Sequence, residues 1–154
     1  MNENKAFTLI EFLIVVGILA GISTAIALNL VNIRSERNLE LDVRKLVATL
    51  HETKNRSVTQ QDSNQWGVHF ENSTSSVDFY QVFYGASYAS GTVVSRTNLN
   101  SGVSFLEPAE GMTEDVIFAK ITGLPDAPKS VTIEATSGSA STTISINAQG
   151  VVSY

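Results

Sequence analysis

One carboxylate stands out in the sequence because it lies near the start of a long apolar run. Between Phe7 and Ile33 the only ionisable side chain is that of Glu11. A helix of about 25 residues is roughly 38 Å long, enough to cross a hydrocarbon core of about 30 Å, where a carboxylate costs roughly 2.5–3.5 kcal/mol. Glu11 therefore needs a cationic partner if the run lies in a membrane. The alternative is a stray acid near one end of an ordinary signal anchor.

The residue types that most often build metal or catalytic sites are sparse. His51 and His69 are the only histidines, the chain has no Cys, and nothing pairs either histidine with acids at a metal-ligand spacing. The many Ser and Thr residues include no Gly-x-Ser-x-Gly elbow beside a base. We therefore predict no catalytic residue, no metal site, no cofactor and no enzymatic activity.

Four acidic residues lie close together in the second half of the chain and offer oxygen ligands of the kind that Ca²⁺ prefers. They are Glu107, Glu110, Glu114 and Asp115. Their spacing is not the ordered spacing of a calcium loop, so a solvated acidic turn is the simpler interpretation.

Length and charge limit the classes of protein that the chain can form. The chain has 154 residues and a net charge of −5, and residues 61–154 carry three basic and nine acidic side chains, a balance of −6. These residues form one domain of under 100 residues, which is enough to bury a modest core. Because an acidic surface repels phosphates, the charge argues against nucleic acid as a partner.

The apolar run continues, without a Pro, into an amphipathic stretch. We therefore expect one helix from Thr8 to Val58, with residues 7–33 as a transmembrane or filament-core half and residues 34–60 as an amphipathic half. The apolar residues of the second half recur at spacings of three and four, which predicts a stripe that packs on a sheet. This stripe comprises Leu39, Val43, Leu46, Val47 and Leu50.

Residues 61–154 read as short strands separated by Gly, Ser, Asn and Pro, a pattern typical of a β-rich globular domain. We predict an α+β fold in which the long helix packs on an antiparallel β-sheet domain of one sheet or two. The expected strands are Trp66–Phe70, Val77–Phe83, Gly91–Ser95, Val103–Phe105, Val116–Ile121, Ser130–Ala135, Thr142–Asn147 and Val151–Ser153.

The start of the chain, KAFTLIEFLIVVGILA, resembles the prepilin signal of type IV pilins and type II secretion pseudopilins. The resemblance implies that residues 1–6 are a leader, that a prepilin peptidase cleaves between Ala6 and Phe7, and that the new N-terminus is methylated. It also implies that Glu11, the fifth residue after the cut, serves in assembly. Ala6 stands where the family usually has Gly.

Cleavage after Ala6 would leave a cationic amine on Phe7, four residues from the carboxylate of Glu11. In a medium of low effective dielectric such a pair interacts far more strongly than in water. Between neighbouring subunits it would fix the axial register of a filament. Processing would then act as the switch, because the uncleaved chain has its amine six residues too early.

Three further segments, WGVHF, VIFAKITG and INAQGVV, resemble the pattern of minor pseudopilins of the GspH/FimT type. The resemblance implies a pilin-like fold and a structural subunit of a type IV pilus or type II secretion pseudopilus. It further implies the prepilin peptidase, other pilin or pseudopilin subunits, an assembly-platform membrane protein and membrane lipid as partners. The expected location is the inner (cytoplasmic) membrane, single-pass, with the C-terminal domain extracytoplasmic, and the filament after assembly.

Two other functions remain open at this point. The first is a binding module at a filament tip, such as a receptor for DNA uptake, which in FimT-like proteins uses a basic C-terminal segment. Here the chain after Lys129 contains no Lys or Arg, which argues against it. The second is a plain signal-anchored extracytoplasmic domain, which predicts no cleavage at Ala6 and indifference to Glu11.

Overall fold

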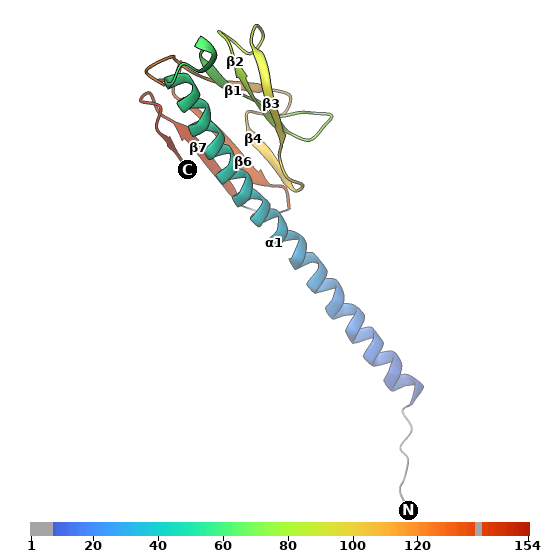
Figure 1. Cartoon of the computed structure of the whole chain (residues 1–154). Helices are drawn as coiled ribbons and strands as arrows, with labels where there is room; N and C mark the ends of the chain where they lie inside the picture. The colour runs from blue at the N-terminus through green and yellow to red at the C-terminus, as the bar shows by residue number, and fades with distance from the viewer. Residues whose placement is uncertain (1–7, 138–139) are drawn as a thin grey trace, which may run out of the picture.

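The computed structural model of the chain describes residues 8–137 and 140–154, and it describes the side chains of the long helix over residues 9–23 and 33–58. This helix, α1 (Leu9–Val58), begins after the N-cap Thr8 and is followed by the C-cap Thr59. Figure 1 shows α1 as a rod whose C-terminal part lies in the domain and whose N-terminal part projects from it. A short 3₁₀ helix, η1 (Gln61–Ser63), then leads to the first strand.

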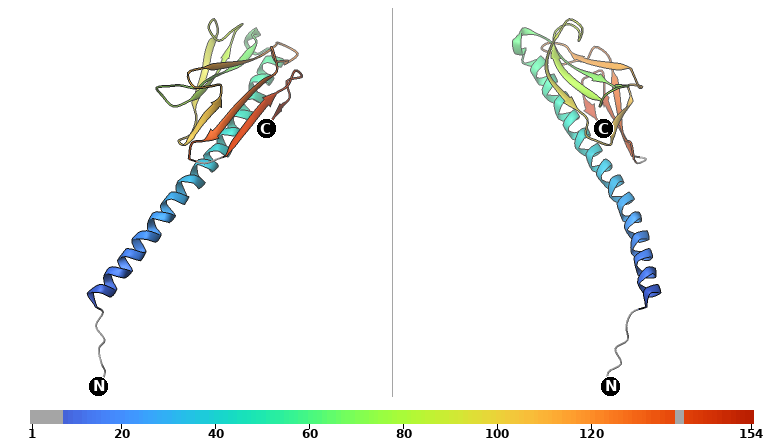
Figure 2. Two further views of the ribbon diagram at one scale, coloured as in Figure 1. Left: turned by 180° about the vertical axis from the view of Figure 1, so that it is seen from behind. Right: turned by 90° about the vertical axis from the view of Figure 1, so that its right-hand side faces the viewer.

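Eight strands follow in the described part of the chain, and they form two four-stranded sheets. The first sheet has the order β3-β2-β1-β5 and the second the order β4-β6-β7-β8, with antiparallel pairing throughout. Figure 2 shows the sheets lying against one side of the C-terminal part of α1. The strands are β1 (Trp66–Glu71), β2 (Phe79–Tyr84), β3 (Thr92–Asn98), β4 (Val103–Glu107), β5 (Thr113–Phe118), β6 (Lys129–Ala135), β7 (Ser141–Ile146) and β8 (Val152–Ser153).

The hydrophobic core is one cluster that takes residues from α1 and from both sheets. The helix supplies four members of the predicted stripe, each at most 4% exposed, and Val47 packs against the cluster from its edge. Full burial of such a side chain contributes about 1.5–3 kcal/mol. The sheets add inward-facing side chains, among them Trp66, Phe70, Tyr80 and Phe118 from the first and Phe105, Ile133 and Ile144 from the second.

Buried polar side chains of α1 tie loops of the domain to the helix. The carboxylate of Asp42 accepts hydrogen bonds from the backbone N and the Nδ2 of Asn100, both at 2.8 Å. Loss of solvation on burial raises the pKa of Asp42, although the hydrogen bonds from Asn100 act against that rise. Ser57 accepts a hydrogen bond from the Trp66 N at 3.2 Å and donates one to the Phe118 O at 2.5 Å. The end of α1 is thereby joined to two neighbouring strands of the first sheet.

The strand positions expected from the sequence are confirmed to within a few residues, with one clear shift. The strand expected at Val116–Ile121 is β5, which begins three residues earlier and ends at Phe118. The chain turns directly afterwards, because the Ala119 N donates to the Leu124 O at 2.8 Å and the Gly123 N to the Ala119 O at 2.9 Å. A closed turn of this kind cannot continue the ladder of the sheet.

The predicted fold class, a helix with a membrane half and an amphipathic half packed on an antiparallel β-sheet domain, needs correction. Where the sequence left one sheet or two open, the strands divide between two sheets and α1 packs across both. The two sheets also pack on each other, as the edge-to-face contact of Phe70 and Phe105 shows, with ring centroids 5.9 Å apart. The physical reason is that the inward faces of eight strands offer more apolar surface than one helical stripe covers.

The part of the predicted fold class that is wrong is the membrane half, expected from Phe7 to Ile33. Among the described residues no helix is long and apolar enough to cross a membrane.

Candidate functional site

The first turn of α1 holds Glu11 in a defined position. The Glu11 N donates to the Thr8 Oγ1 at 3.3 Å, and the carboxylate accepts from the Thr8 N at 3.4 Å and from its hydroxyl at 3.3 Å. This reciprocal arrangement is a capping box, in which Ser or Thr at the N-cap is followed three residues later by Glu or Gln. The carboxylate also lies at the positive end of the helix dipole. Glu11 therefore helps to start the helix, a role that the sequence analysis missed although the Thr8–Glu11 spacing is its signal.

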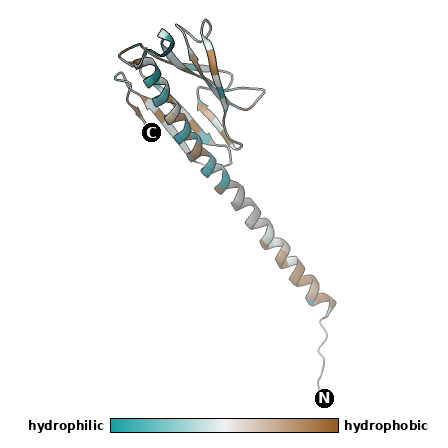
Figure 3. Cartoon of the chain, in the orientation of Figure 1, coloured by the Kyte–Doolittle hydropathy of each residue, from teal (hydrophilic) through white to brown (hydrophobic). Residues whose placement is uncertain are grey.

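The apolar side chains that follow Glu11 are exposed on every side of the helix. Ten of them between Leu9 and Ile22 are 44–78% exposed, and Figure 3 shows this part of α1 as the hydrophobic end of the rod. A helix that is apolar all round is normally buried among other apolar surfaces. The ten residues are Leu9, Ile10, Phe12, Leu13, Ile14, Val15, Val16, Ile18, Leu19 and Ile22.

The expected cleavage site, between Ala6 and Phe7, lies outside the described residues. The ion pair expected between the Phe7 amine and the Glu11 carboxylate therefore stays a prediction. Glu11 itself is exposed, so that a cationic group of another chain can reach its carboxylate.

The structure brings together three side chains that the sequence did not predict to be neighbours: His69, Glu71 and Asp115. His69 is only 4% exposed, its Nδ1 lies 2.5 Å from the Asp115 Oδ1, and its Nε2 lies 3.7 Å from the Glu71 Oε2. Glu71 follows His69 by two residues on one strand and could have been noticed, since such residues share a face. Asp115 pairs with His69 only because β5 lies beside β1. The other histidine, His51, is exposed on α1.

The acidic residues of the predicted turn do not converge on one point. Glu114 forms an ion pair with Lys129, and its hydrogen bond raises the pKa of that lysine. Asp115 faces His69 instead, and Glu110 lines a cavity. Over residues 8–137 and 140–154, no group of three or more His, Cys, Asp or Glu side chains is arranged to hold a metal ion.

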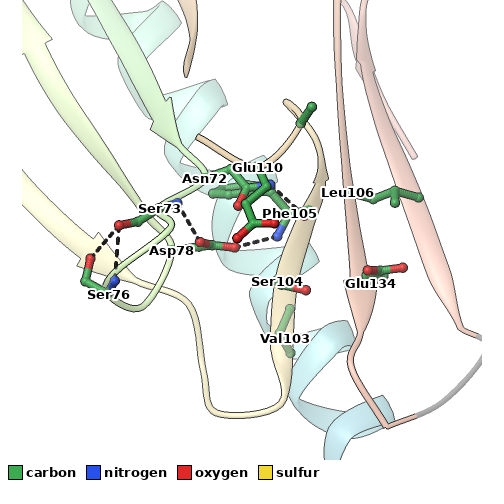
Figure 4. Close-up of a pocket in the computed structure, with 11 residues that line it drawn as sticks. Asn72, Ser73, Ser76, Asp78, Val103, Ser104, Phe105, Leu106, Glu110 and Glu134 are labelled. Carbon is green, nitrogen blue, oxygen red and sulfur yellow. Dashed lines mark hydrogen bonds between the residues drawn. The ribbon is translucent and has the colours of Figure 1, made fainter. Parts of the chain in front are cut away.

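That cavity, of about 520 Å³, opens beside β4 and the loop that joins β1 to β2 (Figure 4). Asp78 accepts hydrogen bonds from the Phe105 N at 2.8 Å and the Ser73 N at 2.9 Å, and the Asn72 Nδ2 donates to the Phe105 O at 2.9 Å. These buried side chains attach an edge strand of the second sheet to the first sheet. Their polar atoms bond to the backbone of the walls, which indicates a structural role.

Comparison of the chain with protein-family models, curated proteins and solved structures finds no match. The candidate site is therefore defined by its own geometry and sequence: the start of α1, with Glu11 and the exposed apolar stretch.

Proposed function

We propose that the chain is a structural subunit, a minor pilin or pseudopilin, of a type IV pilus or a type II secretion pseudopilus. Prepilin peptidase cleaves it between Ala6 and Phe7, and the first half of α1 joins it to other subunits. The observation that carries the proposal is the exposed apolar stretch from Leu9 to Ile22 on a helix whose other half buries its apolar stripe against the domain. The prepilin-like sequence around Glu11 supports it independently.

The distribution of the exposed side chains favours several neighbours over a single groove. Apolar residues occupy consecutive positions such as Leu13, Ile14, Val15 and Val16, so they point in all directions around the helix axis. A single docking groove would cover one stripe and leave the rest in water. A bundle of equivalent helices covers every face, and in such a bundle the low dielectric strengthens the pairing of Glu11 with an N-terminal amine.

Processing is the first test. The full chain is co-expressed with an active prepilin peptidase or with a catalytically inactive variant of it, and the intact mass is measured. We expect the active enzyme alone to remove six residues and leave Phe7 as the N-terminus. A full-length chain in both cultures contradicts the proposal and favours a plain signal-anchored domain.

Assembly is the second test, and the capping box makes a clean pair of variants possible. Glu11→Gln removes the charge, yet Gln is also accepted at this position of a capping box. Thr8→Ala removes the N-cap side chain and keeps the charge. We expect Glu11→Gln to be processed but depleted from sheared filaments, whereas Thr8→Ala is incorporated. Depletion of Thr8→Ala alone assigns the residue pair to helix capping and contradicts a role of the Glu11 charge in assembly.

A further inference from the structure

His69 lies in a row of polar side chains that crosses the first sheet. Asp115 on β5, His69 on β1, Gln81 on β2 and Arg96 on β3 are successive cross-strand partners. The inward-facing neighbours of His69 on β1 are core residues, so this row lies on the opposite, outer face of the sheet. His69 is nevertheless buried there, because the ring of Tyr88 stacks on the imidazole with 3.6 Å between centroids and 2° between planes.

Tyr88 belongs to the connection between β2 and β3, residues 85–91, which folds over the outer face. Its hydroxyl donates to the Gln81 Oε1, and its ring contacts Phe83 edge to face at 5.5 Å. The connection begins and ends with glycines, and Gly85 has φ +137°, a backbone conformation that favours glycine. Loss of solvation, aided by nearby carboxylates, raises the pKa of Tyr88. Tyr88 therefore remains neutral around pH 7. A change of charge at the stacked contact between Tyr88 and His69 must come from another group.

The two protonation states of His69 fit this surrounding differently. A neutral imidazole has one N–H, so donation to Asp115 leaves a lone pair facing the carboxylate of Glu71. A protonated imidazole presents an N–H to each carboxylate and also places a cation over the Tyr88 ring, which strengthens the stacked contact.

Two carboxylates near His69 favour its protonated form, and one cation of the row, Arg96, opposes it. Glu71 and Asp115 carry two negative charges against one ring, while the guanidinium of Arg96 lies 3.5 Å from the centroid of the Phe79 ring and hydrogen-bonds Asn98. The partner on β2, Gln81, is neutral, as is Tyr88 on the connection. Protonation of His69 thus reduces the local negative charge at the closed contact.

We infer that His69 is a protonation-dependent latch, which holds residues 85–91 on the outer face of the first sheet when protonated and releases them when neutral. Because protonation favours the closed form, closure is complete at low pH and is lost as the pH rises. Residues 85–91 lie between β2 and β3 and take no part in the strand pairs, so their release leaves the ladders of both sheets in place.

A spin label tests the latch in the full chain, because the absence of cysteine makes single labelling straightforward. Ala89→Cys places a nitroxide on the connection, and Ser75→Cys places a control label on another exposed loop. We expect the mobility of the label at residue 89 to rise between about pH 5.5 and about pH 8, and that at residue 75 to stay constant. Unchanged Trp66 fluorescence would show that the domain stays folded.

The variants assign the effect to His69. Against the Ala89→Cys background, His69→Gln should abolish the pH dependence, while His51→Gln, at the exposed histidine, should leave it intact. Glu71→Gln removes one carboxylate from the ring without touching the core, and it should shift the transition to lower pH; the exposed Glu107→Gln should not. A mobility that is independent of pH, that rises as the pH falls, or that keeps its pH dependence in His69→Gln overturns the inference.

Discussion

The two halves of α1 are one helix with opposite relations to the rest of the chain. In the second half, apolar residues occupy one stripe, and Leu46 and Leu50 are completely buried against the sheets. In the first half, apolar residues occupy every side and remain exposed, with Ile14 at 57% and Leu9 at 78%. The second half finds its apolar partner within its own chain. The first half has no such partner among the described residues, so its burial requires other molecules.

The largest expected effect comes from placing a charge in the buried stripe. Leu46→Asp buries a carboxylate without a designed partner and should lower the free energy of unfolding by on the order of 4 kcal/mol. Leu41→Asp makes the same chemical change on the same helix at a residue that is 59% exposed, and should cost less than about 0.5 kcal/mol. Urea unfolding followed by the fluorescence of Trp66, the single tryptophan, measures both. Equal costs would show that the stripe is not core.

A smaller effect is expected where α1 ends against the first sheet. Ser57→Ala leaves the buried Trp66 N and Phe118 O without their shared partner, which should cost about 1–3 kcal/mol. Thr59→Ala removes an exposed hydroxyl at the C-cap and should cost less than about 0.5 kcal/mol. The same urea titration compares them. If Ser57→Ala has the same free energy of unfolding as the wild type, the Ser57 hydroxyl does not attach the helix to the sheet.

Asp42 also links the second half of α1 to the domain, through the hydrogen bonds from Asn100, and its contribution to stability depends on pH. Because burial raises its pKa in the folded chain, its stabilising contribution is present below the ordinary value for Asp and is lost as the pH rises through the folded-state value. Asp42→Asn, which does not titrate, should therefore gain stability relative to the wild type as the pH rises above about 4. Unfolding at several pH values measures the difference, with the exposed Asp62→Asn as control. A constant difference for Asp42→Asn would contradict the assignment.

The sequence predicted those features that depend on local periodicity. The stripe, the end of the helix at Val58 and the approximate strand positions all follow from apolar spacing and from turn residues. The division into two sheets does not, because a strand pattern shows which face is apolar and not which strand lies beside it. For the same reason β1 and β5, more than 40 residues apart, could not be paired in advance, and the contact of His69 with Asp115 was missed.

At the candidate site, the sequence identified Glu11 as an anomaly but assigned it only a role between subunits. The capping box adds an intrachain role, which depends on the backbone geometry at Thr8. The expected membrane half, from Phe7 to Ile33, was wrong, because no helix among the described residues is long and apolar enough to cross a membrane.

The smallest effect on the stability of the domain is expected from a substitution in the first half of α1. Such a substitution distinguishes the roles of the two halves most directly. Ile14→Gln changes a side chain that is 57% exposed and keeps a good helix former, so the free energy of unfolding should change by less than about 0.5 kcal/mol. The same variant should be depleted from sheared filaments, because a polar group would be buried without a partner between subunits. Val93→Gln, at an apolar residue of the domain that is 44% exposed, should alter neither measurement. Normal incorporation of Ile14→Gln would mean that its side chain stays in water in the filament, and the apolar stretch would then not be the assembly surface.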